Sequence, residues 1–237
     1  MDSTVDMNIT AIDTASMSLL RLMQLTSPSL PIGAFAYSQG LEQAVELGWV
    51  DGEQSAYEWL RGVLSHSISH MEIPLLARSY IAWRDEDLAS VSLWNDTLLA
   101  SRETAELYEE EHLLGRNLAR LLLDLGVAEA GEWLSGRQTS LVNMFALASV
   151  KWQIPLPMTA QGFAWTWCEN QIAAAIKLVP LGQTAGQRLL GEISGHLLDA
   201  VAVGLKIDDD ICIGQSSIGV ALASSWHETQ YSRLFRS

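Results

Sequence analysis

The stretch LTSPSLPIGAFAYSQGLE, residues Leu25–Glu42, separates two segments with helical patterns and contains two prolines and two glycines. Because Pro28 and Pro31 fix φ near about −65° and lack a backbone N–H, a helix arriving from the N-terminal side must end before them. Gly33 permits a positive φ that other residues avoid, so an apolar helix is expected to restart at Ala34 or Phe35. The stretch therefore predicts a bend between two helices.

The content of this bend is unusual for a connection. Phe35 and Tyr37 stand beside Ser38 and Gln39, and the stretch is almost uncharged. Connections on a protein surface are normally polar, whereas aromatic residues are enriched in contacts between proteins. The composition favours a buried junction or a surface that meets a partner over a solvated loop.

Outward from the bend, apolar residues recur with helical spacing almost throughout the chain. We expect helices over residues 17–25, 41–47, 54–69, 74–83, 88–99, 101–125, 139–150, 160–178, 181–205 and 218–225. No run of alternating β-branched residues with hairpin turns recurs. The sequence predicts an all-α, single-domain helical bundle of about ten helices, with a flexible N-terminal arm (1–16), a domain (17–226) and a C-terminal tail (227–237).

Three segments carry more detailed expectations. In 101–125 leucines occupy one side, Arg102 and Glu103 fall on the polar sides, and Ser101 with Thr104 forms the expected N-cap. The segment 160–178 is apolar all round and should be central. The glycines of 126–136 indicate a loop or broken turn, and those of 181–205 would admit another helix closely.

Composition excludes several classes of function. The chain has 28 acidic against 14 basic residues and a net charge of −14, so neither nucleic acid nor an anionic membrane is an expected partner. No uncharged apolar run reaches the ~18 residues of a membrane span. With only Cys168 and Cys212 as cysteines and no secretory signal, buried thiols in a reducing compartment and a cytoplasmic location are expected.

Motifs of common enzyme classes are absent from the sequence. There is no phosphate-binding Gly-x-x-x-x-Gly-Lys run, no Gly-x-Ser-x-Gly elbow and no paired zinc cysteines. The acidic triplet Asp208–Asp210 lacks the alternating ligands of a calcium loop. We therefore expect no catalytic residues, no cofactor and no enzymatic activity.

Several histidines and one lysine could each have either a structural or a functional role. His66 and His70 lie four apart on a predicted helix, which suits a nickel or zinc ion, although no third ligand is identifiable. His112 follows three glutamates and suits a solvated acidic face, and His196 suits a hydrogen-bonded packing role. Lys177 stands in an uncharged segment, either covering apolar surface with its stem or offering a cation to a partner near a helix C-terminus.

Four long motifs, taken together, point to a family. They are LPIGAFAYSQGLE at residues 30–42, SRET at 101–104, KLVPLGQTAGQ at 177–187 and HETQYSRLFRS at 227–237. In this order they closely resemble the UreF family of urease accessory proteins, from about Leu19 to the last residue. Ala36 stands where a serine is common in the family, and residues 1–16 lie outside the resemblance.

The resemblance implies an all-α homodimer without a catalytic site. Members work in the cytoplasm with a second accessory protein, called UreD or UreH, and with the nickel-carrying GTPase UreG. That assembly docks on apo-urease and helps to load nickel into its carbamylated-lysine active site, driven by GTP hydrolysis, and UreE supplies nickel in many systems. Family members have been proposed to regulate the GTPase.

The resemblance also implies where partners bind. Tyr37, Ser38, Gln39 and Glu42 would face the dimer or the GTPase, with Phe35 packed inward, and Lys177 and Gln183 would form a second patch. The tail, with Tyr231, Arg233, Leu234, Phe235 and Arg236, would become ordered on the UreD-type partner, since a basic, aromatic segment without its own core can order when a partner buries it. Two other hypotheses remain: a helical nickel-binding protein that uses His66 and His70, and a purely structural adaptor.

Overall fold

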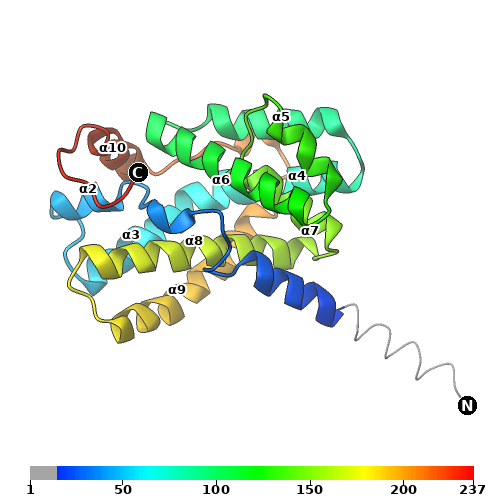
Figure 1. Ribbon diagram of the computed structural model, residues 1–237. Coiled ribbons are helices and arrows are strands. Elements are labelled where there is room, and N and C mark those ends of the chain that lie inside the picture. Colours follow the sequence, from blue (N-terminus) through cyan, green and yellow to red (C-terminus); the bar gives the residue numbers. More distant parts are fainter. Residues whose placement is uncertain (1–14) are drawn as a thin grey trace, which may run out of the picture.

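The computed structural model describes residues 15–237, and every regular element in them is helical (Figure 1). After an N-terminal helix at residues 15–25, the α-helices are α2 (Leu41–Glu46), α3 (Glu53–Val63), α4 (Ile73–Arg84), α5 (Leu88–Ala100), α6 (Ala105–Asp124), α7 (Leu141–Lys151), α8 (Leu156–Leu178), α9 (Gln183–Gly204) and α10 (Ile218–His227). Short 3-10 helices lie at η1 (Ala34–Ala36), η3 (Ala128–Leu134) and η4 (Asp210–Cys212), and η2 (Leu64–Glu72) is a π-helix. The predicted single all-α domain of about ten helices is confirmed.

Local sequence signals set several helix starts. The side chains of Asp87, Thr104 and Ser140 accept hydrogen bonds from backbone N–H groups in the first turns of α5, α6 and α7. These caps satisfy donors that have no partner within the helix. Pro74, which is predicted to open a helix, is the second residue of α4 but lies inside a continuous helical segment, because the π-helical η2 leads directly into α4.

Two predicted boundaries are wrong. Helices 54–69 and 74–83 are not separate, because η2 joins α3 to α4 without a break. The helix expected from Ser101 begins at Ala105, since Thr104 is its N-cap, so Arg102 and Glu103 belong to the connection after α5. The glycine-rich 126–136 contains η3, which buries Ala130 and Trp133.

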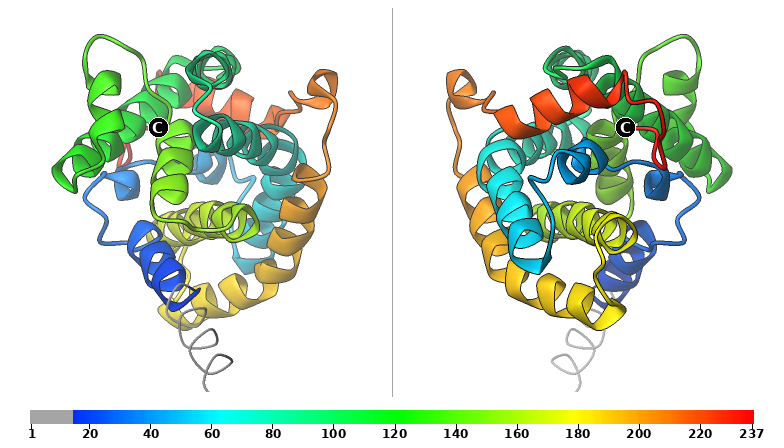
Figure 2. Two further views of the ribbon diagram at one scale, coloured as in Figure 1. Left: turned by 90° about the vertical axis from the view of Figure 1, so that its right-hand side faces the viewer. Right: turned by 90° about the vertical axis from the view of Figure 1, so that its left-hand side faces the viewer.

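The core is organised around α8, as predicted from its apolar sequence. Figure 2 shows α8 surrounded by other helices, and ten of its residues are buried. Helix α9 packs along it, and α7, nearly all buried, lies against α4 and α6. Two glycines permit close approach: Gly115 of α6 lies against the backbone of Thr139 and Ser140, and Gly204 of α9 lies against Ile73.

The bend at residues 30–42 forms, but its second half differs from the prediction. Gly33 has φ of +87°, as expected, and is followed only by the single 3-10 turn of η1. Helix α2 starts later, at Leu41, after Gln39 (φ +53°) and Gly40 (φ +78°). A side chain at position 40 would overlap the backbone of Ser224 in α10, so this glycine lets α10 lie directly on the bend.

The structure also bears on the predictions for the N-terminal arm, the two cysteines and membrane-spanning helices. The predicted flexible arm, residues 1–16, lies outside the described residues except for Ala15 and Ser16, which are helical. Cys168 is buried as expected, and burial raises the pKa of its thiol to about 12. Cys212 is exposed, because it lies at the end of η4 in a surface connection, so the prediction of two buried thiols is wrong for this residue. Within residues 15–237 no helix is long and apolar enough to cross a membrane.

Candidate functional site

The C-terminal tail folds back onto the bend, so that two of the four sequence motifs form one surface. We call residues 33–40 the loop and residues 228–237 the tail. Arg236 N–H donates to Ala36 O over 2.9 Å, and Ser38 N–H donates to Ser237 O over 2.8 Å. Figure 1 shows the C-terminus beside α2 and α10. Segments about 200 positions apart in the sequence therefore meet as backbone partners.

Glu42, in the first turn of α2, holds the tail by its backbone. Its two carboxylate oxygens accept the N–H groups of Leu234 (2.7 Å) and Phe235 (2.8 Å). The side chain is nearly buried, with 8% of the residue exposed. A buried carboxylate that accepts two backbone N–H groups forms strong, charge-assisted hydrogen bonds. Glu42 thus holds the tail of its own chain, and its predicted role as a contact for another protein stays a prediction.

His227, the last residue of α10, connects two such carboxylates. Its Nδ1 lies 2.6 Å from Glu106 Oε2 and its Nε2 lies 3.2 Å from Glu42 Oε2, and the residue is fully buried. Both ring nitrogens face carboxylate oxygens, so the ring links α10 to α6 and α2. Arg233 of the tail donates to the other oxygen of Glu106 over 2.6 Å. The acidic body thus holds the basic tail by a partly exposed ion pair at Glu106.

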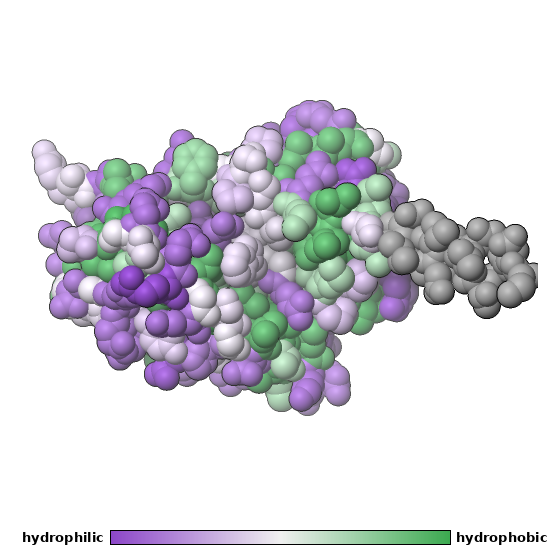
Figure 3. Space-filling view, turned by 90° about the horizontal axis from the view of Figure 1, so that it is seen from below, coloured by the Kyte–Doolittle hydropathy of each residue, from purple (hydrophilic) through white to green (hydrophobic). Residues whose placement is uncertain are grey.

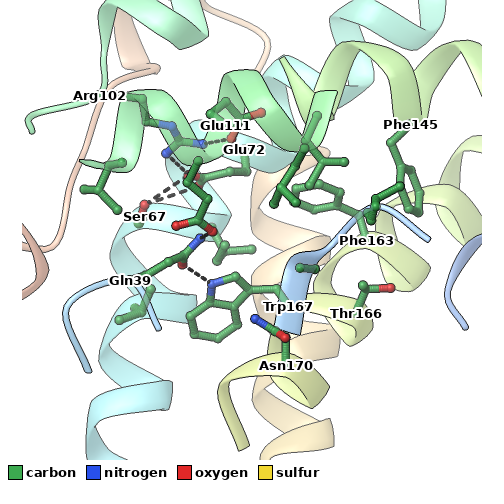
Figure 4. A pocket seen from close by; sticks show the side chains of 18 of the residues that line it. Gln39, Ser67, Glu72, Arg102, Glu111, Phe145, Phe163, Thr166, Trp167 and Asn170 are labelled. Atoms are coloured by element: carbon green, nitrogen blue, oxygen red, sulfur yellow. Dashed lines mark hydrogen bonds and ion pairs between the residues drawn. The ribbon is translucent and has the colours of Figure 1, made fainter. Parts of the chain in front are cut away.

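Glu110 of α6 contacts both the loop and the tail. Its carboxylate accepts Ser237 Oγ–H over 2.6 Å and Gln39 Nε2–H over 2.8 Å. The amide oxygen of Gln39 in turn accepts Trp167 Nε1–H over 2.7 Å (Figure 4). This hydrogen bond fixes the loop to α8 at Gln39, whose backbone φ is positive. Burial raises the pKa of Glu110 to about 7, although the Ser237 and Gln39 hydrogen bonds favour its ionised form.

The predicted orientations of Phe35 and Tyr37 are reversed. Phe35 is 68% exposed, whereas Tyr37 is 5% exposed and Ser38 is completely buried. The tail causes this difference, because Arg236 and Ser237 lie directly over Tyr37 and Ser38. Burial raises the pKa of the Tyr37 hydroxyl, and a side-chain hydrogen bond with Arg236 opposes that rise.

The other predicted partner residues divide into covered and exposed groups. Phe235 is buried, and Lys177 Nζ lies 5.3 Å from the centre of its ring, close enough for a cation–π interaction. Tyr231 is fully exposed and Leu234 is 65% exposed. Arg236 is also exposed, as is Gln183, the first residue of α9. The tail buries Phe235 on its own chain while presenting Tyr231 and Leu234 outward.

A buried ion cluster next to this surface was not predicted. Arg102 donates to Glu72 over 2.6 Å and to Glu111 over 2.7 Å, and all three side chains are largely buried (Figure 4). Burial by itself would lower the pKa of Arg102, but Glu111 and Glu72 raise it above its usual range. The cluster borders a cavity of about 90 Å³ that Gln39 and Glu110 also line. The sequence does hold one signal for this cluster, the N-cap residue Thr104. An N-cap at Thr104 places Arg102 in the connection before the helix and not on the polar side of the helix.

The histidines have separate local partners. His112 Nδ1 accepts Thr139 N–H over 3.0 Å, and Glu110 and Glu111 beside it are buried, so the predicted solvated acidic face is wrong. His196 bonds to Tyr57 over 2.7 Å, which confirms its packing role. His66 Nδ1 bonds to Gly62 O and His70 Nδ1 to Ser69 Oγ. Across residues 15–237 no three His, Cys, Asp or Glu side chains form a group that could hold a metal.

A second feature lies away from the loop and tail. The N-terminal helix, α8 and α9 together expose an apolar face and border a groove of about 290 Å³. Its large exposed side chains are Met17, Leu19, Leu20, Met23, Trp165 and Leu198. Figure 3 shows patches of apolar residues, interspersed with hydrophilic ones, on this underside of the molecule. Large apolar side chains exposed beside a groove are typical of a site of association.

Comparison with known proteins agrees with the resemblance. A model of the UreF protein family matches residues 50–194. A urease accessory protein UreF of Alkalilimnicola ehrlichii is 51% identical over 217 residues, which cover 92% of this chain and 95% of the relative. UreF proteins of Chromohalobacter salexigens and Pseudoalteromonas translucida are 49% and 47% identical, covering 93% and 94% of this chain and 95% and 96% of theirs. The chain therefore belongs to the UreF family of urease accessory proteins.

Proposed function

We propose that this protein is a non-catalytic co-chaperone of urease maturation in the cytoplasm. With a UreD/UreH-type protein and the GTPase UreG it forms a complex that docks on apo-urease and promotes GTP-dependent insertion of nickel, the cargo of the reaction. In this proposal the protein regulates the GTPase and needs no cofactor of its own. Its family membership supports a role in urease maturation.

The observation that carries the proposal is the composite surface of the loop and the tail. The tail is held at its backbone by Glu42 while Tyr231 and Leu234 project outward, and Phe35 of the loop is also exposed. Aromatic and leucine side chains presented by an ordered backbone lose little entropy on binding, which favours recognition of a protein partner. We assign the tail to the UreD-type protein and the loop, with Lys177 and Gln183 beyond it, to the GTPase.

We further propose that the protein is a homodimer that uses its apolar face. The groove between the N-terminal helix and α8 and α9 lies next to the exposed ridge of Leu19, Leu20 and Met23. In a two-fold dimer the same surface of both copies forms the interface. A surface with a ridge beside a groove suits this symmetry, because the ridge of each copy can enter the groove of the other. The face also lies apart from the tail, which leaves the tail free for other proteins.

Co-purification tests the proposal directly. The tagged chain, a UreD-type protein, UreG and apo-urease are mixed with GTP and magnesium, and the bound fraction is analysed. We expect a complex that contains all the partners and that depends on the tagged chain. Folded partners that fail to co-purify under these conditions would refute the proposed assembly. Tyr231→Ala is expected to weaken binding of the UreD-type protein. The matched control is Tyr57→Phe, which removes the hydroxyl that contacts His196 and should leave binding of the UreD-type protein unchanged.

A further inference from the structure

Two arginines on the outer face of α6 have no partner of opposite charge. Arg116 and Arg120 are both exposed, and their spacing of four residues places them on the same side of the helix, one turn apart. Within residues 15–237 neither side chain forms an ion pair, a hydrogen bond or a ring contact. Like charges at this spacing repel each other. The pair is therefore a small positive patch on a chain with 28 acidic and 14 basic residues.

This patch differs from the surroundings of most other arginines in the protein. Arg188 and Arg233, for example, are also exposed, but each forms an ion pair with a glutamate of the acidic body. In the part of the chain that the structure describes, Arg61 of α3 is the one further arginine without an ion pair, hydrogen bond or ring contact. The acidic body thus neutralises most of its arginines and leaves Arg116 and Arg120 available to a partner.

The patch lies beside the loop. Asn117, between the two arginines in the sequence, donates Nδ2–H to Ile32 O over 2.8 Å, so the bend runs along this part of α6 (Figure 1). Ile32 immediately precedes the loop, in which Phe35 is 68% exposed. A protein that covers Phe35 can therefore extend onto the outer face of α6. The exposed aromatic ring and the two cations are parts of one surface.

We propose that Arg116 and Arg120 bind an acidic segment of the protein that docks on the loop. A guanidinium group presents parallel N–H donors that match the two oxygens of an Asp or Glu carboxylate. The net charge of −14 repels an acidic partner over most of the surface, so a local pair of cations favours one orientation of that partner. This inference rests on the proposed function, in which the GTPase binds the loop.

Binding of the purified GTPase to the full chain, in the presence of the UreD-type protein, tests the proposal. The double variant R116E/R120E should bind the GTPase at least about fivefold more weakly, because one exposed ion pair alone changes affinity by up to about fivefold. The affinity of the wild-type chain should also fall more steeply with added salt than that of R116A/R120A, since salt screens exposed charges. Circular dichroism should show unchanged folding, because neither arginine has a contact to lose.

The matched control is R61E, which reverses the charge of the unpaired arginine on α3 and should keep the wild-type affinity. If R116E/R120E binds the GTPase as tightly as R61E does, the proposal is overturned. A loss of binding to the UreD-type protein with unchanged binding to the GTPase would equally contradict it. A wild-type chain that binds no GTPase would refute the proposed function as well, so the two failures are distinguishable.

Discussion

At the scale of single residues, the buried cluster of Arg102, Glu72 and Glu111 is the feature on which the site depends most. Arg102 fixes the connection between α5 and α6, and Glu111 also accepts Val142 N–H of α7 over 3.2 Å. Two carboxylates removed from water are stable only while a cation satisfies both. Because Glu110 precedes Glu111 in the same helix turn, the cluster also sets the position of the loop and tail contacts.

Replacing Arg102 by alanine should leave two buried carboxylates unpaired. We expect a loss of about 3–5 kcal/mol in the free energy of unfolding, the usual cost of breaking a buried ion pair. Urea denaturation followed by circular dichroism measures it. Arg116→Ala, an exposed arginine on α6, is the control and should change stability by less than about 0.5 kcal/mol. Equal effects of the two substitutions would contradict the structural role of Arg102.

Lys177→Ala tests the cation beside the tail. The loss of an exposed cation–π contact with Phe235 should cost only about 0.5–1 kcal/mol, so the protein should remain folded. In the proposed complex the substitution should weaken the response of GTP hydrolysis by UreG. A collapse of thermal stability would instead show that the lysine stem covers apolar surface as its main role, and an unchanged GTPase response would remove Lys177 from the partner surface.

At the scale of elements, the packing depends on a few close approaches between backbones. Gly115 of α6 lies against the start of α7, where a Cβ would overlap Thr139 O and the carbonyl carbon of Ser140. Since these are backbone atoms, they cannot move aside by changing rotamer. Gly62 in the interior of α3 faces open space, because a Cβ there would have no neighbour within 4 Å outside its own helix backbone.

This contrast yields a paired prediction. Gly115→Ala should destabilise the protein by about 1–3 kcal/mol or more through overpacking. Gly62→Ala should instead stabilise α3 by up to about 1 kcal/mol, since alanine is the better helix former. Thermal unfolding of the two variants and the wild-type chain decides between these signs. If both variants gain stability, α6 and α7 are not as close as the structure places them.

Most helices were predictable because local signals repeat along them. Leucine periodicity and the Thr104 cap are properties of neighbouring residues. The wrong predictions concern the junctions between helices. Residues 64–72 are π-helical, but their apolar pattern resembles that of an α-helix. The sequence therefore does not reveal that α3 continues through this segment into α4. The change from α-helical to π-helical hydrogen bonding does not alter the spacing of apolar residues clearly enough to be recognised in the sequence.

At the scale of the whole molecule, the apolar face predicts how two copies meet. Met23→Asp places a charge on the exposed ridge of the N-terminal helix and should convert the proposed dimer to a monomer. Light scattering coupled to size-exclusion chromatography measures the mass. Leu93→Asp, at a similarly exposed leucine of α5, is the control and should leave the dimer intact. A dimer that survives Met23→Asp would place the interface elsewhere.

The candidate site shows the limit of sequence reasoning. The motifs at residues 30–42 and 227–237 stand out in the sequence, but their direct contact depends on the complete fold. Phe35 and Tyr37 are both aromatic, and only the covering tail decides which is buried. Likewise, the sequence does not reveal that the Glu42 carboxylate binds the backbone of the tail, because Glu42 and Leu234 lie 192 positions apart in the chain.

The most direct test of the account is GTP-dependent nickel transfer into apo-urease with purified UreG, a UreD-type protein and this chain. We predict that the full chain activates urease and that deletion of Tyr231–Ser237 abolishes activation while circular dichroism shows unchanged helical content. The expected loss follows because the deletion removes Tyr231 and Leu234 and also uncovers Tyr37 and Ser38. A truncated chain that still loads nickel at the full rate would contradict the central claim.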